Sequence, residues 1–185
     1  MPKVSQEHLD ARRAQILAGA RRAFATYGYD GATVARLEEA TGLSRGAIFH
    51  YFPDKLAIFV ALAADTNRRF IDLIVERGLE QAVRATTSES RDWLGVLIEV
   101  ETRLRHDEDF NRRLMEAHEP EQEKISAWFE NEQASGRLRA DVHWLELARF
   151  ATIVINGLAI RIVAGDPFDV ETTLRLLNDA LAPRD

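Results

Sequence analysis

The side chains best suited to recognising a nucleic acid gather in one short stretch of this sequence, residues 33–55. That stretch reads TVARLEEATGLSRGAIFHYFPDK and carries Arg45, His50, Tyr51 and Lys55 close together. An Arg can donate two hydrogen bonds to a guanine edge, whereas Lys, Tyr and His can bond to phosphate oxygens. The residue types in this stretch therefore predict contact with double-stranded DNA.

Small and neutral residues among those groups fit the same chemistry. Gly46 and Ala47 would let the backbone approach a duplex, and Phe49 offers only apolar contact with a thymine methyl or a sugar. Thr33, at an expected helix start, can donate to a phosphate, whereas Arg36 either contacts DNA or stays in solvent. The predicted DNA-binding residues are Thr33, Arg36, Arg45, Gly46, Ala47, Phe49, His50, Tyr51 and Lys55.

Two short helices joined by a tight turn must hold these side chains. Thr33 is a suitable N-cap for the first helix, which ends at Gly42, and Ser44 is a suitable N-cap for the second. In the second helix Ile48 and Phe52 lie four residues apart, so both face the core and the polar side faces outward. The pattern predicts a helix-turn-helix, whose second helix enters the major groove of DNA.

The rest of the chain repeats apolar residues at helical spacing. A helix over 6–27 is expected to end at Gly28, and Pro53 to begin a long helix that runs to Gly78. With breaks at Pro120, Gly136 and the 165–167 turn, the further predicted helices are 91–106, 108–117, 121–135, 143–164 and 169–182. The sequence therefore predicts an all-α fold of about nine helices, with a DNA-binding head at 1–53 and a helical body at 54–185.

Composition excludes several classes of protein. The 185 residues include no Cys, which rules out disulfides, thiolate nucleophiles and Cys-ligated metals. The formal net charge is −6, yet residues 1–55 hold eight basic and six acidic residues, so a polyanion would be met by the head. The charged start of the sequence lacks the apolar region of a secretory signal, and we expect a cytoplasmic protein.

Residues 144–164 are apolar enough to resemble a membrane span. Glu146, Arg149 and Arg161 interrupt this stretch on different faces, and each would be costly in a bilayer, so no membrane insertion is expected. A helix that is apolar on several sides belongs in a large core or between two subunits. The final helix offers a matching stripe of Val170, Leu174, Leu177 and Leu181. The two helices could form half of a four-helix bundle between two copies, or a monomer could bury both stripes.

The stretch from residue 24 to residue 55 resembles the N-terminal region of the TetR-type transcriptional regulators. The matching segments are FATYGYDGAT and GLSRGAIFHYFPDK, and the shared positions are Phe24, Gly28, Tyr29, Thr33, Gly42, Ser44, Gly46, Ile48, Phe52 and Lys55. The resemblance implies a homodimeric DNA-binding repressor, joined through its last two helices, that leaves a palindromic operator when a small-molecule effector enters the body. Within the family, ATVARLEEATGLSRGAIFHYF is most similar to actinobacterial aconitase repressors. That similarity implies a tricarboxylate effector such as citrate, with or without Mg²⁺, and no required cofactor.

Polar residues stranded in apolar helices are the candidates for effector binding. They are Glu99, Arg103, Asn156 and Arg161. A buried Arg must be paired, either with a carboxylate of the protein or with an anionic ligand. No metal site is predicted, because His106, Asp107, Asp109 and His118 lack the i, i+4 spacing of helical metal ligands and fit solvated helix ends better.

Two other functions remain open at this point. The chain could be a helical ligand-binding protein or enzyme whose helix-turn-helix is not functional, or an interaction module that acts through its apolar helices. The sequence has no nucleophile elbow, phosphate-binding loop, His/Cys cluster or HExxH motif, which disfavours an enzyme. The basic residues of the first helix, Arg12, Arg13, Arg21 and Arg22, are interpreted as a solvated or ion-paired face, with phosphate contact as the alternative.

Overall fold

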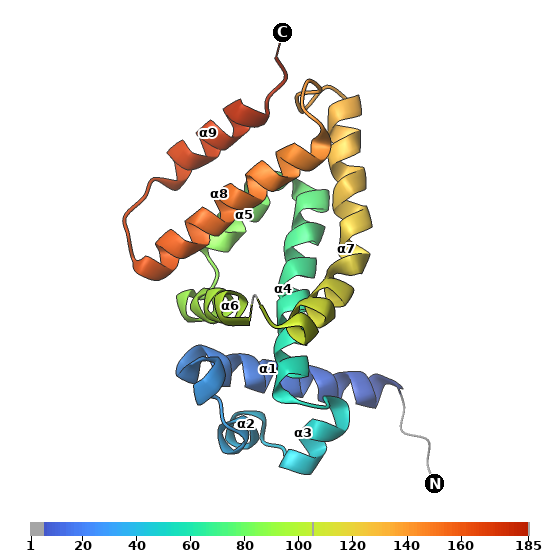
Figure 1. The fold of residues 1–185 in the computed structure, drawn as a ribbon, viewed down its shortest axis with the longest axis vertical. Helices are drawn as coiled ribbons and strands as arrows, with labels where there is room; N and C mark the ends of the chain where they lie inside the picture. Colours follow the sequence, from blue (N-terminus) through green and yellow to red (C-terminus); the bar gives the residue numbers. More distant parts are fainter. Residues whose placement is uncertain (1–5, 105, 185) are drawn as a thin grey trace. The chain divides into compact units, whose positions relative to one another are not determined.

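The computed structural model describes residues 6–104 and 106–184, with the side chains of Arg103 and Leu104 outside the description. Within those ranges every regular element is an α-helix (Figure 1). The helices are α1 (Gln6–Gly31), α2 (Val34–Thr41), α3 (Arg45–Tyr51), α4 (Lys55–Arg77), α5 (Leu79–Thr87), α6 (Arg91–Leu104), α7 (Glu108–Ala134), α8 (Trp144–Ala164) and α9 (Val170–Leu181). The predicted all-α fold is confirmed.

Local sequence signals set the boundaries of the first three helices. In α1 the backbone leaves helical geometry at Gly28 (φ 69°, ψ 173°), which is where the sequence predicts the helix to end. Thr33 caps α2 by accepting from the Arg36 N–H, and Gly42 closes it in the left-handed conformation at φ 69°. Ser44 caps α3 in the same way by accepting from the Ala47 N–H. The predicted helix-turn-helix boundaries are therefore confirmed.

The long helix α4 begins two residues later than predicted. Pro53 precedes the helix, and the Ala57 N–H donates to Asp54 Oδ1 at 2.6 Å. A carboxylate at the N-cap satisfies an otherwise unpaired N–H and interacts favourably with the helix dipole. Asp54 is therefore the capping residue, and the prediction that Pro53 lies in the first turn is wrong.

Two features of the middle of the chain also differ from the prediction. The helix α5 was not predicted; its buried residues Leu79, Ala82 and Val83 share one face, directly after Gly78 at φ 84°. Conversely, α7 is one helix and continues through Pro120, where the prediction has a break. A Pro inside a helix removes one backbone hydrogen bond, whereas Phe110 and Phe129 are both buried on α7, on either side of it. Burial on both sides of the Pro outweighs the local loss.

The chain divides into two compact units. The first comprises Met1–Asp65 and Gly95–Ala117, and the second Thr66–Leu94 and His118–Asp185. This division is based on packing alone. It does not test the predicted functional boundary after residue 53, which stays a prediction.

The first unit has an aromatic centre. The ring of Phe24 stacks on Tyr29 with centroids 5.6 Å apart and meets Phe59 edge-on at 6.1 Å, and Phe59 lies 6.4 Å from Phe110. Offset and edge-to-face arrangements of this kind add to the stabilisation that apolar burial supplies. Residues of α1, α4 and α7 thus share one core, over which α2 and α3 are held.

The second unit is built around a cluster of aliphatic side chains with one aromatic ring. Its buried members are Ile71, Ile74, Leu79, Ala82, Val83, Phe129, Leu147, Ala151, Leu158, Leu174, Leu177 and Leu181. The α9 residues Leu174, Leu177 and Leu181 therefore face the core of their own chain, and the expectation that this stripe faces a second copy is wrong for these three. The exposed large apolar residue of α9 is Leu176, at 62%.

Only part of α8 lies in that core. The helix is long and apolar enough to cross a membrane, which is weak evidence by itself, and 17% of its most apolar window is buried. Leu147, Ala151 and Leu158 are buried, whereas Ile153 is 68% exposed and Ile160 is 54% exposed. Of the two predicted settings, burial of the whole helix in its own core is wrong, since only one side is buried, and a position between subunits stays a prediction.

Candidate nucleic-acid interface

The predicted recognition helix α3 is held rigidly at its N-terminal end. The Arg45 N–H donates to Glu38 Oε1 at 2.6 Å, and the Ala47 N–H donates to Ser44 Oγ at 3.3 Å. Two of the N–H groups that a helix start leaves unpaired are thereby satisfied. Ile48 and Phe52 are buried beneath the helix. The end that would enter a groove therefore has a fixed position relative to α2.

The outer face of α3 carries the predicted contact residues. Arg45, Gly46 and His50 are exposed, while Ala47, Phe49 and Tyr51 are half-buried. A side chain added at Gly46 would meet nothing within 4 Å, so the glycine leaves a free path for close approach. The Arg45 guanidinium lies 6.0 Å from the centre of the Phe49 ring. Phe49 thus lies beside the predicted base-reading residue.

His50 and Tyr51 lie at the C-terminal end of the same helix. Their rings meet edge-on at 5.2 Å. Polar groups are thus presented from the first turn of α3 to its last, as a helix lying along a groove requires.

Thr33 and Arg36 take up different positions on α2. Thr33 is exposed at the N-terminal end of the helix. The Arg36 guanidinium lies 4.0 Å from the centre of the Tyr27 ring and donates to the Gly31 carbonyl at 2.7 Å. A cation on an aromatic face with a carbonyl acceptor is held in place, not freely solvated. DNA contact by Arg36 stays a prediction, with its side chain already anchored on α1.

Lys55 is likewise engaged within the protein. Its Nζ donates to the Tyr29 carbonyl at 2.8 Å and lies 4.4 Å from the centre of the Tyr29 ring. The side chain therefore ties the start of α4 to the last turn of α1. A phosphate contact by Lys55 would add to this structural role.

Sequence reasoning missed three braces that join α1 to the helix-turn-helix. Arg13 Nη1 donates to the Tyr51 carbonyl at 3.3 Å, and its guanidinium lies 4.6 Å from the Phe52 ring centre. Arg22 Nη2 donates to the Ala40 carbonyl at 2.7 Å, and Gln15 Nε2 to the Thr41 carbonyl at 2.9 Å. Arg13 and Arg22 are exposed, as the prediction of a solvated face expects, but they also bond to backbone carbonyls of the helix-turn-helix.

A signal for two of these braces, those of Gln15 and Arg22, does exist in the sequence. The last turn of α2 contains no basic residue, although the terminal carbonyls of a helix need donors. Donors for them must come from elsewhere in the chain, and α1 supplies them.

An ion-pair network in the first unit anchors the start of α4. Arg113 of α7 bonds to Asp54 at 2.9 Å and to Asp109 at 2.8 Å. The neighbouring carboxylates raise the pKa of Arg113, Asp54 foremost. The pKa of Asp109 is lowered, first by its hydrogen bond with Arg113 and also by Arg112. Residues far along the chain thus support the capping carboxylate of α4, beside the predicted interface.

The predicted effector-binding residues are divided between the two units. Glu99 is exposed in the first unit, where its Oε2 would lie 3.4 Å from a Cβ added at Gly28. Asn156 and Arg161 belong to the second unit and are exposed, and Arg161 bonds to Asp166 at 2.6 Å. The side chain of Arg103 lies outside the described residues. The premise that Glu99, Asn156 and Arg161 are buried is wrong; effector binding by them stays a prediction.

His118 was expected at a solvated helix end. It lies instead inside the continuous helix α7 and is half-buried, and its Nε2 has no hydrogen-bond partner among the described residues. Burial lowers the pKa of His118, partly offset by the nearby Glu121 carboxylate. No group of three His, Asp or Glu side chains is placed to hold a metal ion within the described ranges.

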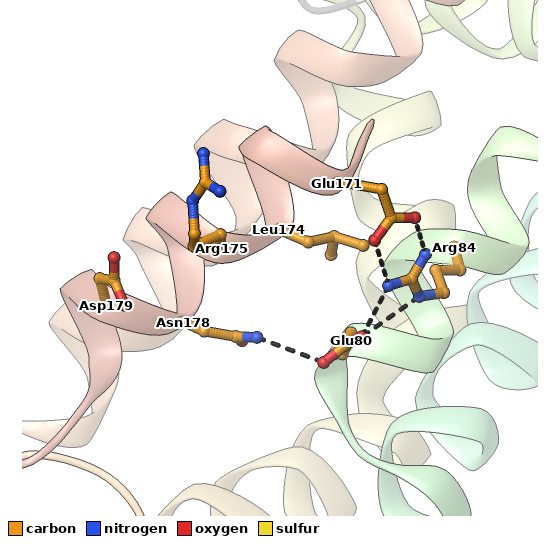
Figure 2. Close-up of a pocket in the computed structure, with 7 residues that line it drawn as sticks. All are labelled: Glu80, Arg84, Glu171, Leu174, Arg175, Asn178 and Asp179. Atoms are coloured by element: carbon orange, nitrogen blue, oxygen red, sulfur yellow. Dashed lines mark hydrogen bonds and ion pairs between the residues drawn. The ribbon is translucent and has the colours of Figure 1, made fainter. Parts of the chain in front are cut away.

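The second unit has a hollow of about 300 Å³ between α5 and α9 (Figure 2). Its lining residues are Glu80, Arg84, Glu171, Leu174, Arg175, Asn178 and Asp179. Sequence reasoning singled out none of its polar members.

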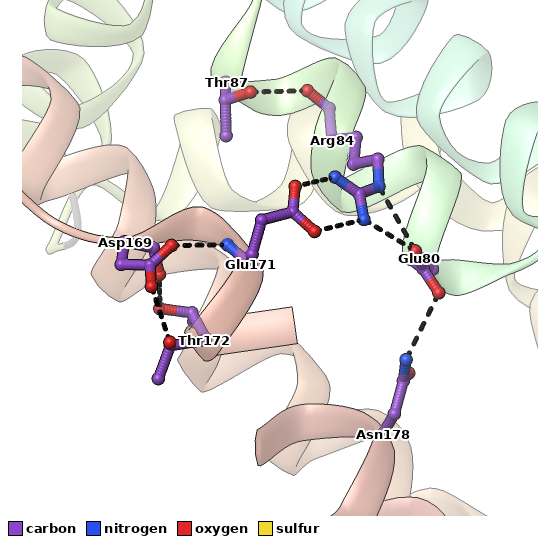
Figure 3. A network of polar contacts seen from close by, with 8 residues as sticks. Glu80, Arg84, Thr87, Asp169, Glu171, Thr172 and Asn178 are labelled. Atoms are coloured by element: carbon purple, nitrogen blue, oxygen red, sulfur yellow. Dashed lines mark hydrogen bonds and ion pairs between the residues drawn. The ribbon is translucent and has the colours of Figure 1, made fainter. Parts of the chain in front are cut away.

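The charges of this hollow are largely satisfied by one another, as Figure 3 shows. Arg84 Nη2 bonds to Glu80 at 2.8 Å and to Glu171 Oε2 at 2.7 Å, and Asn178 donates to Glu80 at 3.2 Å. The hydrogen bonds from Arg84 lower the pKa of both carboxyls. A charged ligand would have to displace these bonds, so the arrangement serves to pin α9 to α5.

Comparisons with known proteins agree with the geometry of the head. The sequence-family model described as "Bacterial regulatory proteins, tetR family" matches residues 16–62. The HTH-type transcriptional repressor Rv1474c of Mycobacterium tuberculosis is 41% identical over 184 residues, which are 98% of each chain. The HTH-type transcriptional repressor AcnR of Corynebacterium diphtheriae is 38% identical over 184 residues, 98% of this chain and 97% of that one.

Solved structures share the fold at lower identity. Salmonella enterica GusR has a TM-score of 0.75 at 21% identity, covering 97% of this chain and 98% of that one. A likeness at this level concerns the fold alone, whereas the relatives above match along nearly their whole length. On that evidence the chain belongs to the TetR family of bacterial transcriptional regulators, close to the actinobacterial repressors named AcnR.

Proposed function

We propose that this protein is a homodimeric repressor that binds a palindromic DNA operator through α3 and releases it when a small-molecule effector binds the helical body. The observation that carries the proposal is the doubly capped N-terminus of α3, with Arg45 and His50 exposed and open space at Gly46. The relatives named transcriptional repressors support a regulator rather than an enzyme. A protein that acts on chromosomal DNA would work in the cytoplasm.

Seven of the nine predicted contact residues supply side chains for base or phosphate contacts in this proposal. Arg45 reads a base edge, with Phe49 beside it for a thymine methyl or a sugar. His50, Tyr51, Lys55 and the start of α2 at Thr33 contact phosphates and fix the register of the head on the duplex. Arg36, anchored on Tyr27, reaches a phosphate or a base edge at the rim.

The exposed apolar residues of α8 support the dimer. Phe150, Ile153 and Ile160 are each at least 40% exposed, and Leu176 of α9 is 62% exposed. Soluble proteins rarely leave such residues together in water. A dimer that covers them would present two α3 helices to successive major grooves, about 34 Å apart on the operator.

The effector is proposed from the relationship to AcnR-named repressors and not from a cavity. A tricarboxylate such as citrate is the candidate, alone or with Mg²⁺. The described residues offer no set of three metal ligands, so we propose no metal site formed by the protein alone. The effector would favour a body conformation in which the two heads are wrongly spaced for the operator, and the population would shift accordingly.

A mobility-shift experiment on genomic fragments tests the proposal. The full chain should select a fragment with an inverted repeat, and citrate, with and without Mg²⁺, should weaken that complex. Selection of no fragment over random DNA would contradict repression through α3. Selection that is indifferent to citrate and Mg²⁺ would contradict this effector and leave the DNA-binding role standing.

A further inference from the structure

One glycine in α8 has no explanation within a single chain. Gly157 lies in the middle of the helix without a positive φ, and a Cβ added there would meet nothing within 4 Å. A glycine in a helix interior weakens the helix relative to alanine. Neither backbone geometry nor packing inside the chain requires Gly157.

Gly19 in α1 shows what a helical glycine does when its partner is present. A Cβ at Gly19 would lie 2.7 Å from the Ala40 carbonyl oxygen and 2.7 Å from Thr41 Cα. The end of α2 therefore crosses α1 at a distance that only glycine allows. Gly157 has no such neighbour within 4 Å in the same chain.

The residues around Gly157 form one exposed face of α8. Thr152 and Ile153 are each followed four residues later by another member of the face, Asn156 and Gly157, and Ile160 lies three residues beyond Gly157; all five positions are exposed. Residues 150–160 contain no charged side chain. The nearest charges are already paired at the two ends, Arg149 with Glu146 at 2.5 Å and Arg161 with Asp166 at 2.6 Å. The face is thus uncharged at its centre and bounded by ion pairs.

The face is also nearly symmetric about the point between Asn156 and Gly157. Ile153 and Ile160 lie at equal distances from that point along the helix. If a second α8 runs antiparallel across it, Ile153 meets Ile160 of the partner subunit and Asn156 meets the partner's Gly157. A twofold axis produces this pairing, because it applies the same contact twice.

We propose that two copies of this chain pair through an antiparallel crossing of α8 at Gly157, with Asn156 beside the twofold axis. The proposal rests on the dimer of the proposed function and specifies its register. Gly157 lets the backbones approach, and Asn156 fills the space beside it. A polar side chain buried there needs a hydrogen-bonding partner, which the same residue of the second copy supplies. Pairing out of register, or with a different apolar helix, would leave Asn156 unsatisfied, so the contact favours self-recognition.

A second copy fits this face better than a lipid bilayer does. The opposite side of α8 is packed into the core of the second unit through Leu147, Ala151 and Leu158. A helix that spans a bilayer would have to leave that core and carry Arg149 and Arg161 with it.

Cysteine crosslinking tests the register, because the natural chain contains no Cys. In the proposed crossing, Asn156→Cys and Gly157→Cys lie near the axis and should form covalent dimers on mild oxidation. The matched control is Glu146→Cys, exposed on the same helix, which would lie about 30 Å from its copy at 1.5 Å per residue. A mixture of Ile153→Cys and Ile160→Cys chains should crosslink more than either variant alone.

The outcomes separate this proposal from the dimer itself. Crosslinking at positions 156 and 157 with none at 146 is the expected result. Crosslinking at 146 as well as at 157 would indicate parallel pairing and overturn the crossing. A wild-type dimer in sedimentation with no crosslink at 156 or 157 would overturn the crossing and leave the proposed function intact. A wild-type monomer at micromolar concentration would overturn both.

A size-based variant checks the same point without cysteine. Gly157→Leu should raise the dimer dissociation constant at least tenfold while the helical content of the chain is kept, since the position is open in a single chain. An unchanged dissociation constant would overturn the close approach at Gly157.

Discussion

Two glycines set the head and the body of this protein apart. Gly19 fits against Ala40 and Thr41 within the head, whereas Gly157 faces open space on α8. Backbone carbonyls at the helix ends of the head also find partners inside it, since they accept hydrogen bonds from Arg13 and Arg22. The head is thus a finished module, whereas α8 keeps an exposed apolar face that the proposed second copy would cover.

The largest expected effect lies at the reading surface of the head. Arg45→Ala should cost about 1–3 kcal/mol per half-site on operator DNA and little on random DNA, because a base contact is lost. Lys55→Ala should weaken binding to both DNAs alike, since its predicted partner is a phosphate. Fluorescence anisotropy with operator and random duplexes measures both. Equal losses on the two DNAs for Arg45→Ala would show that Arg45 holds phosphate.

The close approach at Gly19 should be the next most sensitive point. Gly19→Ala would place a methyl group 2.7 Å from backbone atoms of α2, which cannot move without shifting the helix. Overpacking of this kind costs about 1–3 kcal/mol of unfolding free energy, measured by urea denaturation. A stabilised variant would mean that α1 and α2 separate easily, and the head would then not be a finished module.

The brace at the start of α3 should have a smaller effect. Glu38→Ala removes the acceptor of the Arg45 N–H and should cost about 1 kcal/mol in thermal unfolding, as loss of a helix cap does. Glu39→Ala is the matched control, because Glu39 is exposed and the substitution removes the same charge at the next position. If the two variants melt alike, the effect of Glu38 is one of charge and not of capping.

Sequence patterns predict the head better than the body, for a physical reason. Thr33, Gly42 and Ser44 act on neighbouring backbone groups, so their roles can be inferred from local spacing. The partners of Arg22 and Lys55 are carbonyls 18 and 26 residues away, which no spacing rule identifies. Pro120 predicts a helix break that burial on both sides of it overrides.

The candidate effector residues show the same limit. Apolar neighbours in sequence suggested that Asn156 and Arg161 are buried, yet α8 is apolar on a buried and on an exposed side, and both residues are exposed. A pattern of residue types shows that a surface avoids water but not which chain covers it. The DNA-binding residues were easier to find because α3 presents them within one short helix.

The smallest expected net effect, at Gly157, changes with protein concentration. In a single chain Gly157→Ala adds a methyl group that meets nothing, so the monomer should gain about 0.5–1 kcal/mol from the better helix former. In the proposed crossing the same methyl group lies between two backbones. It should therefore raise the dimer dissociation constant about tenfold, which corresponds to about 1.4 kcal/mol.

Thermal melting over a range of protein concentrations separates the two contributions. The variant should melt above wild type at concentrations where both are monomeric, and this advantage should largely vanish where wild type is dimeric, because dimerisation stabilises the folded chain by mass action and the loss of about 1.4 kcal/mol per dimer is shared by two chains. Gly19→Ala should instead lower the melting temperature at every concentration, since its clash lies within one chain. A gain for Gly157→Ala that is the same at all concentrations would place Gly157 outside the interface, and the contrast between the two glycines would then reflect only their exposure.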